Sequence, residues 1–311
     1  NLSLLEVSHR SKDVVEVADK AVSLVRELLQ VPDDYAVLFL QGGASTQFLM
    51  APYNLMKAEN GKAAYVNTGA WSTKAIKEAK KFGATEVIAS SEDKNFNFIP
   101  KGFDIPSDAD YLHITSNNTI SGTQYKSFPE SSVPVVADMS SDIFSRPVDV
   151  SKFGIIYAGA QKNMGPAGVT LAIVKKDLLG KTGRDIPTMM DYQTHIKKDS
   201  MFNTPPVFAL YVSMLTLDWL KNNGGIDWVQ KRNQQKAKLF YNELDSNDLF
   251  VGTAEKEDRS AMNATFLLKD ESLTDAFFAA LEEANISGLK GHRSVGGFRA
   301  SMYNALPPAS V

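Results

Sequence analysis

The stretch Ile-Ile-Tyr-Ala-Gly-Ala-Gln-Lys-Asn-Met-Gly-Pro-Ala-Gly, residues 155–168, decides the fold. It begins inside an apolar, β-branched run, residues 153–157, that is typical of a buried strand. Lys162 follows in a turn that contains glycine and proline, and residues 169–174 form a second apolar run. A lysine on a tight connection between two buried strands has its stem held by the scaffold. Because desolvation lowers the pKa of a lysine, this placement suits an amine that attacks a carbonyl.

A single turn lysine is most often an ordinary surface residue, since perturbed lysines are a small minority. The upstream segment 134–138, Pro-Val-Val-Ala-Asp, changes this balance, because it reads as a short strand that ends in Asp138. A carboxylate at the C-terminal end of a strand faces the crevice where α/β sheets bind ligands. Pyridoxal phosphate (PLP) needs both groups: a lysine holds its aldehyde as a Schiff base, and an acid keeps its pyridine nitrogen protonated. The two segments therefore predict a PLP enzyme.

Length and composition limit the classes of function. The chain has 311 residues, of which 43% are hydrophobic and 22% charged, with a formal net charge of -3. This is enough for one large domain and a smaller one. The slight acidity gives no electrostatic argument for nucleic acid or an anionic membrane, and no apolar run approaches the roughly 20 residues that cross a bilayer. The N-terminus does not read as a signal peptide. Because the sequence contains 0 cysteines, disulfides, thiolate metal sites and a cysteine nucleophile are excluded, and we expect no metal site.

Hydrophobic periodicity predicts an α/β fold with a mostly parallel, doubly wound sheet. A helix capped by Ser11 comes first. The predicted strands are 35–40, 63–67, 85–89, 111–115, 134–138, 153–157 and 169–174, and a long helix follows at 207–221. The run Asn-Asn-Gly-Gly at 222–225 ends that helix. We place a domain boundary there, between a large cofactor-binding domain (1–224) and a small C-terminal α/β domain (225–311). The small domain is predicted as strand 263–268, helix 273–284, loop 289–295 and strand 298–303.

Three polar segments follow predicted strands and are candidates for ligand contact. The segment Gln-Gly-Gly-Ala-Ser-Thr, residues 41–46, opens a helix and could cradle a phosphate, although such turns without a ligand are about as common. It lacks the Gly-Lys-Ser/Thr ending of a P-loop and the three-glycine spacing of a dinucleotide site, which argues against a nucleotide-binding protein or dehydrogenase. Trp71 opens the next helix, either as core filler or as a residue that stacks on a flat ring. The segment 116–122 contains Thr119.

Two His-Arg pairs use half of the four histidines. They are His9-Arg10 and His292-Arg293, and Arg299 lies close to the second pair in sequence. Arginine binds carboxylate and phosphate through two parallel hydrogen bonds, and histidine supplements a dianion site. Solvated surface charge is the more common explanation for any one pair. Two such pairs in one chain favour an anionic substrate.

Six segments, in this order along the chain, resemble the signatures of the phosphoserine aminotransferase family. They are Ser8-His9-Arg10-Ser11, Gly42-Gly43-Ala44-Ser45, Tyr157-Ala158-Gly159-Ala160-Gln161-Lys162-Asn163, Phe202-Asn203-Thr204-Pro205-Pro206, Lys290-Gly291-His292-Arg293 and Gly297-Phe298-Arg299-Ala300-Ser301. Together they span nearly the whole chain and are very specific, although each alone is not. Relative to the family, the chain lacks the usual N-terminal start and the C-terminal helix. Some relatives carry an arginine where Ser45 stands.

The resemblance implies a fold-type I, class V PLP aminotransferase of the cytoplasm, a homodimer whose active sites lie at the interface. In it, Lys162 and Asp138 would be the catalytic residues. PLP would be bound by Ala44, Ser45, Trp71, Thr119, Asp138, Gln161 and Lys162, and by Asn203 and Thr204 of the neighbouring subunit. The substrate would be bound by Arg299, His292 and Arg293, and by His9 and Arg10 of the partner chain.

The reaction implied is transamination between L-glutamate and 3-phosphohydroxypyruvate, giving O-phospho-L-serine and 2-oxoglutarate. Some relatives also act on 4-phosphohydroxythreonine in vitamin B6 synthesis. The alternative on the same fold is another class V aminotransferase, such as a serine–glyoxylate aminotransferase, which would leave the two His-Arg pairs without a role. A cysteine desulfurase is excluded because the chain has no cysteine.

Overall fold

A computed structural model describes residues 3–293 and 295–311, so the predicted loop 289–295 is described except at position 294. The large sheet has seven strands in the described part of the chain, in the order β1-β9-β8-β7-β4-β2-β3. They are β1 (Tyr35–Leu40), β2 (Lys62–Asn67), β3 (Ala84–Ser90), β4 (Tyr111–Thr115), β7 (Val135–Asp138), β8 (Ile155–Gly159) and β9 (Thr170–Lys175). Only β9 runs against its neighbours within this sheet. The other six strands therefore end at the same edge.

Helices cover both faces of this sheet. They are α1 (Lys12–Leu29), α2 (Gly43–Leu55), α3 (Ala70–Ala79), α4 (Tyr192–Ile196), α5 (Val207–Asn222) and α6 (Gly225–Ser246). One core lies between the sheet and α1, α5 and the start of α6, and the other lies between the sheet and α2 and α3. Ser11 caps α1 as predicted, because its side chain accepts a hydrogen bond from the backbone N–H of Val14.

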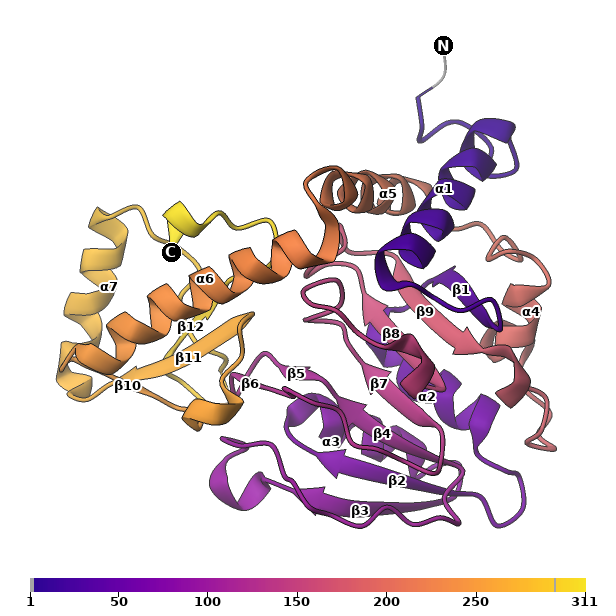
Figure 1. The fold of residues 1–311 in the computed structure, drawn as a ribbon, viewed down its shortest axis with the longest axis horizontal. Helices are drawn as coiled ribbons and strands as arrows, with labels where there is room; N and C mark the ends of the chain where they lie inside the picture. The colour runs from indigo at the N-terminus through magenta and orange to yellow at the C-terminus, as the bar shows by residue number, and fades with distance from the viewer. Residues whose placement is uncertain (1–2, 294) are drawn as a thin grey trace.

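The small domain holds a second sheet of three antiparallel strands, β10 (Phe250–Gly252), β11 (Asn263–Leu268) and β12 (Phe298–Ser301), packed with α7 (Thr274–Glu283). Helix α6 runs from the large domain to this sheet (Figure 1). Its first turns pack Ile226 and Val229 into the large core, and Leu244 near its end packs on the small sheet. The boundary at residue 224 remains a proposal, because α6 belongs to both parts.

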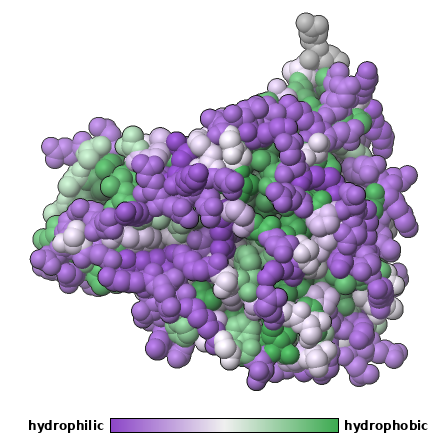
Figure 2. Space-filling model, viewed as in Figure 1, coloured by the Kyte–Doolittle hydropathy of each residue, from purple (hydrophilic) through white to green (hydrophobic). Residues whose placement is uncertain are grey.

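The molecular surface is mostly hydrophilic in the view of Figure 2, with apolar atoms exposed over the large domain and around α7. Among the described residues, no helix is both long enough and apolar enough to cross a membrane. Likewise, no group of three or more metal-binding side chains is found among them.

The predicted strands are confirmed to within about two residues, and four helices and strands of the described chain were not predicted: α4, β5 (Asn117–Asn118), β6 (Thr123–Gln124) and β10. Strand β10 and helix α4 are too short to give a periodic signal, and the hairpin of β5 and β6 lies in a polar segment. The expected alternation of strands and helices is wrong after β3, since only 3₁₀ turns and this hairpin separate the strands from β3 to β9 in the described chain. Helices α1 and α5, from distant parts of the sequence, cover that face instead.

Candidate active site

The carboxyl edge of the large sheet gathers the predicted catalytic residues. In the strand register, Thr115 of β4 lies beside Asp138 of β7, and Asp138 lies beside Tyr157 of β8. Lys162 follows the end of β8 by three residues, and Trp71 is the second residue of α3, which follows β2. The parallel direction of these strands therefore brings together residues that are far apart in sequence.

Lys162 lies half-buried in the turn between β8 and β9. The turn is held by backbone hydrogen bonds from Met164 and Gly165 to the carbonyl of Ala160. The Lys162 amine lies over the ring of Trp71, with Nζ 5.5 Å from the ring centroid. Burial lowers the pKa of Lys162, Asp138 opposes this effect, and Arg299 adds to it. A lysine with a lowered pKa is suited to be a nucleophile or a base near neutral pH.

Asp138 ends β7 and is almost fully buried. Its Oδ1 accepts a hydrogen bond of 2.9 Å from the backbone N–H of Ser140. Burial raises the pKa of Asp138, while the hydrogen bonds from Ser140 and the charge of Lys162 lower it. A cationic ligand beside this buried carboxylate would favour its ionised form, because a nearby positive charge lowers the pKa of an acid.

Trp71, Thr119 and Arg299 form one connected group beside Lys162. The indole N–H of Trp71 donates to Thr119 Oγ1 at 3.3 Å, and Arg299 Nη1 donates to the carbonyl of Thr119 at 3.0 Å. Arg299 lies on β12 of the small domain, whereas the other two belong to the large domain. The site thus depends on how the two domains pack.

A cavity of about 470 Å³ lies next to this group. Its wall includes Arg299, His292 and the backbone of Gly291 from the small domain, and Ile120 and Ser121 from the large domain. The loop that carries His292 is closed by backbone hydrogen bonds from Gly291 to Gly297 and from Arg299 to Leu289. Arg293, next to His292, is exposed. Arg299 and His292 thus line an opening that suits an anionic substrate, and Arg293 adds a positive charge beside His292 in the same loop.

The start of α2 has the features of an anion site. Gly42, with a positive φ of 88°, precedes the helix and gives no side-chain cap to its first N–H groups. Ala44 packs in the same core as Trp71, and Ser45 is exposed. Gln161 is exposed beside Lys162. Uncapped N–H groups at a helix N-terminus bind phosphate readily.

The remaining predicted residues come from two other segments of the chain, 9–10 and 203–204. Gln41 donates through Nε2 to the carbonyl of Thr204 at 2.9 Å, so Thr204 and its neighbour Asn203 lie beside the glycine loop. His9 and Thr204 line a separate cavity of about 480 Å³. Arg10 is exposed. Within one chain, the structure therefore does not bring the first His-Arg pair to the cavity that His292 lines.

Unpaired buried polar atoms also indicate that this site binds a polar ligand such as PLP, whatever the roles of the individual residues. Several buried polar atoms at this edge have no hydrogen-bond partner among the described residues: Thr115 Oγ1, Asn118 Oδ1 and Arg299 Nε. Buried polar groups are normally paired, so this cluster of unpaired atoms indicates a polar ligand. An added Cβ at Gly69 would lie 2.8 Å from Asn118 Oδ1, so only glycine fits there without displacing Asn118.

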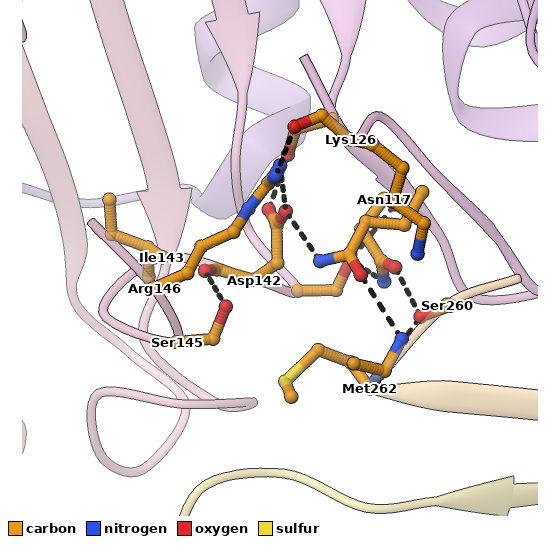
Figure 3. Close-up of polar contacts among 12 residues, drawn as sticks. Asn117, Lys126, Asp142, Ile143, Ser145, Arg146, Ser260 and Met262 are labelled. Carbon is orange, nitrogen blue, oxygen red and sulfur yellow. Dashed lines mark hydrogen bonds and ion pairs between the residues drawn. The ribbon is translucent and has the colours of Figure 1, made fainter. Parts of the chain in front are cut away.

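A polar network that no sequence pattern predicted joins the two domains behind the site (Figure 3). Asp142 accepts hydrogen bonds from Ser116 Oγ and from Gln124 Nε2, and Ser260 Oγ donates to Asn117 Oδ1. Ser116 Oγ also lies within hydrogen-bond distance of the carbonyl of Asp138, at 3.0 Å. The run of polar residues at 116–124 indicates that this segment makes polar contacts. It does not show which distant residues, such as Ser260, are its partners.

Comparison with known proteins identifies the family and the fold. The family model described as "Aminotransferase class-V" matches residues 2–311. The phosphoserine aminotransferase of Flavobacterium psychrophilum is 66% identical over 311 residues, which cover 100% of this chain and 87% of that protein. The solved phosphoserine aminotransferase of Bacillus circulans subsp. alkalophilus is 48% identical with a TM-score of 0.96, and the alignment covers 99% of this chain and 86% of that one.

A PLP-bound phosphoserine aminotransferase from Trichomonas vaginalis is 37% identical with a TM-score of 0.93, over 99% of this chain and 89% of that one. These similarities confirm the predicted α/β fold of fold-type I and the predicted cofactor. The chain belongs to the class-V aminotransferase family and is an aminotransferase that uses PLP.

Proposed function

We propose that this aminotransferase transfers an amino group between L-glutamate and 3-phosphohydroxypyruvate, giving O-phospho-L-serine and 2-oxoglutarate. The observation that carries the proposal is the cavity lined by Arg299 and His292 beside the Lys162 amine. Glutamate and phosphoserine both carry an α-carboxylate and a second anionic group. The relatives named as phosphoserine aminotransferases give further support.

Lys162 and Asp138 are the proposed catalytic residues. When bound, PLP holds the transferred amino group and accepts negative charge that develops at the substrate α-carbon. The Lys162 amine removes the proton from that carbon, and its lowered pKa keeps a usable fraction of it neutral. Asp138 keeps the ring nitrogen protonated. The attraction between its carboxylate and the cationic nitrogen is stronger where water is excluded, because the local dielectric constant is lower.

The other proposed cofactor contacts surround the ring and the phosphate. Trp71 stacks on the ring and, with Thr119, closes one side of it to water. The N–H groups of Ala44 and Ser45 and the side chain of Gln161 bind the phosphate. Asn203 and Thr204 contact the phosphate bound in a second subunit.

A homodimer is part of the proposal. Arg299 binds the substrate α-carboxylate, and His292 and Arg293 bind the distal phosphate. His9 and Arg10 complete that phosphate site from the partner subunit, which agrees with their distance from the His292 cavity within one chain. The exposed side chains of Leu5, Phe202 and Phe208 lie on the same segments as His9 and Asn203 and would be covered in a dimer. We place the enzyme in the cytoplasm, where glutamate-dependent amino-acid synthesis takes place.

A coupled assay with phosphoserine and 2-oxoglutarate, run beside unphosphorylated serine, tests the substrate. We expect phosphoserine to be preferred by about 100-fold or more in kcat/KM, because serine lacks the phosphate that the proposed site would bind. Equal use of serine, or a preference for glyoxylate as the acceptor, would favour a serine–glyoxylate aminotransferase instead. The same assay with 4-phosphohydroxythreonine tests the second substrate of some relatives.

The variant Arg293→Ala tests the phosphate site. Its kcat/KM for phosphoserine should fall about tenfold or more, with little change for serine. Lys290→Ala, which removes another cation of the same loop, is the matched control and should keep the preference. An equal loss for both amino donors in Arg293→Ala would contradict a phosphate contact.

A further inference from the structure

The chain that leaves β12 is bonded directly to the turn that carries Lys162. The backbone N–H of Asn304 donates to Asn163 Oδ1 at 2.9 Å, and both asparagines are buried. Asn163 is the residue after Lys162, and Asn304 lies shortly after Arg299 of β12. One hydrogen bond therefore joins the two segments that carry the reactive amine and the arginine opposite it.

Asn163 uses both ends of its amide. Its Oδ1 accepts the Asn304 N–H, and its Nδ2 donates to the carbonyl of Ile143 at 3.1 Å. The hydrogen bonds from Met164 and Gly165 to Ala160 fix the internal shape of the turn. They do not fix where the turn lies relative to the small domain, and the Asn163 amide makes that connection.

The side chain of Asn304 holds its own backbone in place. Its Nδ2 donates to the carbonyl of Phe144 at 2.9 Å, and its Oδ1 accepts from Asn233 Nδ2 at 2.8 Å. Phe144 belongs to the large domain, and Asn233 lies on α6 and is buried. These two bonds set the position at which the Asn304 N–H meets Asn163.

Lys236 fixes the same segment from the next turn of α6. Its side chain is fully buried, and its Nζ donates to the carbonyls of Met302 and Tyr303 at 2.9 and 2.7 Å. Burying an ammonium group is costly unless it is hydrogen-bonded, so this arrangement persists only while the two carbonyls stay in place. Helix α6 thus clamps the chain between β12 and Asn304.

The other end of this segment contacts the large domain through Arg299. Its Nη1 donates to the carbonyl of Thr119 at 3.0 Å, next to the ring platform of the site. Contacts therefore run in a closed circuit from Lys162 through Asn163 and Asn304 to β12 and Arg299, and back to the large domain at Thr119. A closed circuit of this kind fixes the placement of the Lys162 amine relative to the Arg299 guanidinium.

We propose that Asn163 and Asn304 are positioning residues that hold the Lys162 amine in register with Arg299. The inference rests on the proposed roles of these two residues: Arg299 binds the substrate carboxylate while the Lys162 amine removes a proton from the adjacent carbon. A misplacement of about 1 Å can cost about 100-fold in rate, so a bond that sets this register affects catalysis as well as stability.

The experiment compares Asn163→Ala with Asn54→Ala in the holoenzyme. Asn54 is an equally buried asparagine whose Nδ2 donates to the carbonyls of Met50 and Met190 and whose Oδ1 accepts the Tyr192 N–H. Both variants should lower the melting temperature, because each loses a buried amide. Only Asn163→Ala should also lower kcat, by about tenfold, the effect we assign to a modest loss of register.

The visible circular dichroism of bound PLP gives a readout without turnover, because this signal depends on how the protein orients the ring. It should change in Asn163→Ala and stay at the parent value in Asn54→Ala. An unchanged signal in Asn163→Ala, with kcat within about twofold of the parent protein, would overturn the proposal and leave Asn163 a purely structural residue. If Asn163→Ala does not fold, Asn163→Ser gives the same comparison, because its side chain is too short for the bond to Asn304.

A double variant tests whether the two asparagines act through one bond. Asn304→Ala should lower kcat about as much as Asn163→Ala, since the Asn304 N–H is no longer held in place. The double variant should then stay within about twofold of Asn304→Ala, because both substitutions remove the same interaction. Losses that multiply to about 100-fold would show independent effects and refute the shared bond.

The outcome does not depend on which amino donor the enzyme prefers, because kcat is measured with the donor that it uses best. Retained turnover in Lys162→Ala would refute the role of Lys162 itself. Turnover that requires Lys162 but is unaffected in Asn163→Ala would refute only the positioning role of the two asparagines.

Discussion

Replacing Ser260 by alanine should loosen the attachment of the small domain. Ser260 is fully buried, and its Oγ accepts the backbone N–H groups of Met262 and Asn263, each at 2.9 Å, while donating to Asn117 Oδ1 (Figure 3). Ser260→Ala leaves three buried polar groups without this partner and creates almost no cavity. Each such group costs about 1–3 kcal/mol, and local relaxation favours the low end, so we expect a loss of about 3 kcal/mol.

Denaturant unfolding of the apoprotein measures this loss. Ser246→Ala is the matched control, because the Ser246 hydroxyl, at the exposed end of α6, donates within its own helix to the carbonyls of Asn242 and Glu243. It should change the free energy of unfolding by no more than about 0.5 kcal/mol. Since β11 and β12 carry Arg299 against Thr119, Ser260→Ala should also raise KM for both amino donors. A loss below about 1 kcal/mol would refute the inference that this network holds the domains together.

Three further predictions concern substitutions of Lys162, Trp71 and Lys236. Lys162→Ala should abolish transamination without changing the circular dichroism spectrum; retained turnover would refute its catalytic role. Trp71→Ala should weaken PLP binding by about 30-fold, the equivalent of about 2 kcal/mol of lost ring contact, measured by cofactor titration. Burial lowers the pKa of Lys236 to about 8, from 10.5 in the unfolded chain. Between these two pH values the unfolded chain binds more protons than the folded protein. The contribution of Lys236 to the free energy of unfolding therefore rises with pH in this range. The unfolding free energy of the parent protein minus that of Lys236→Met should therefore increase from pH 8 to 10. A constant difference would contradict the lowered pKa.

The strands and the residues at their ends could be predicted because the signal is local. Asp138 and Lys162 each follow an apolar run, and parallel strands bring such ends to one edge whatever the rest of the chain does. The glycine loop before α2 was found for the same reason. Family resemblance supplied the roles that no local pattern carries, such as those of Thr119 and Asn203.

Contacts between distant segments could not be predicted. Ser260 and Asn117 are 143 positions apart, and each is an unremarkable polar residue in its own segment. His113 and Tyr157 lie on strands that read simply as buried, and only the strand order places them on either side of β7. The short strand β10 gives no periodic pattern, yet it pairs with β11 and completes the small sheet.

The opposite pKa shifts of Lys162 and Asp138 have one cause, and this links cofactor binding to stability. Burial disfavours the charged form of both side chains, so the site without cofactor carries an unfavourable electrostatic free energy that their mutual attraction only partly offsets. A ligand with a protonated ring nitrogen would pair with the carboxylate, and its carbonyl would react with the amine. Such a ligand would reduce the electrostatic cost of both buried side chains. If Lys162 and Asp138 bind PLP as proposed, the same burial that makes the site costly in the apoprotein strengthens cofactor binding. Because PLP binds the folded state, we expect the melting temperature to rise with PLP concentration, as mass action requires.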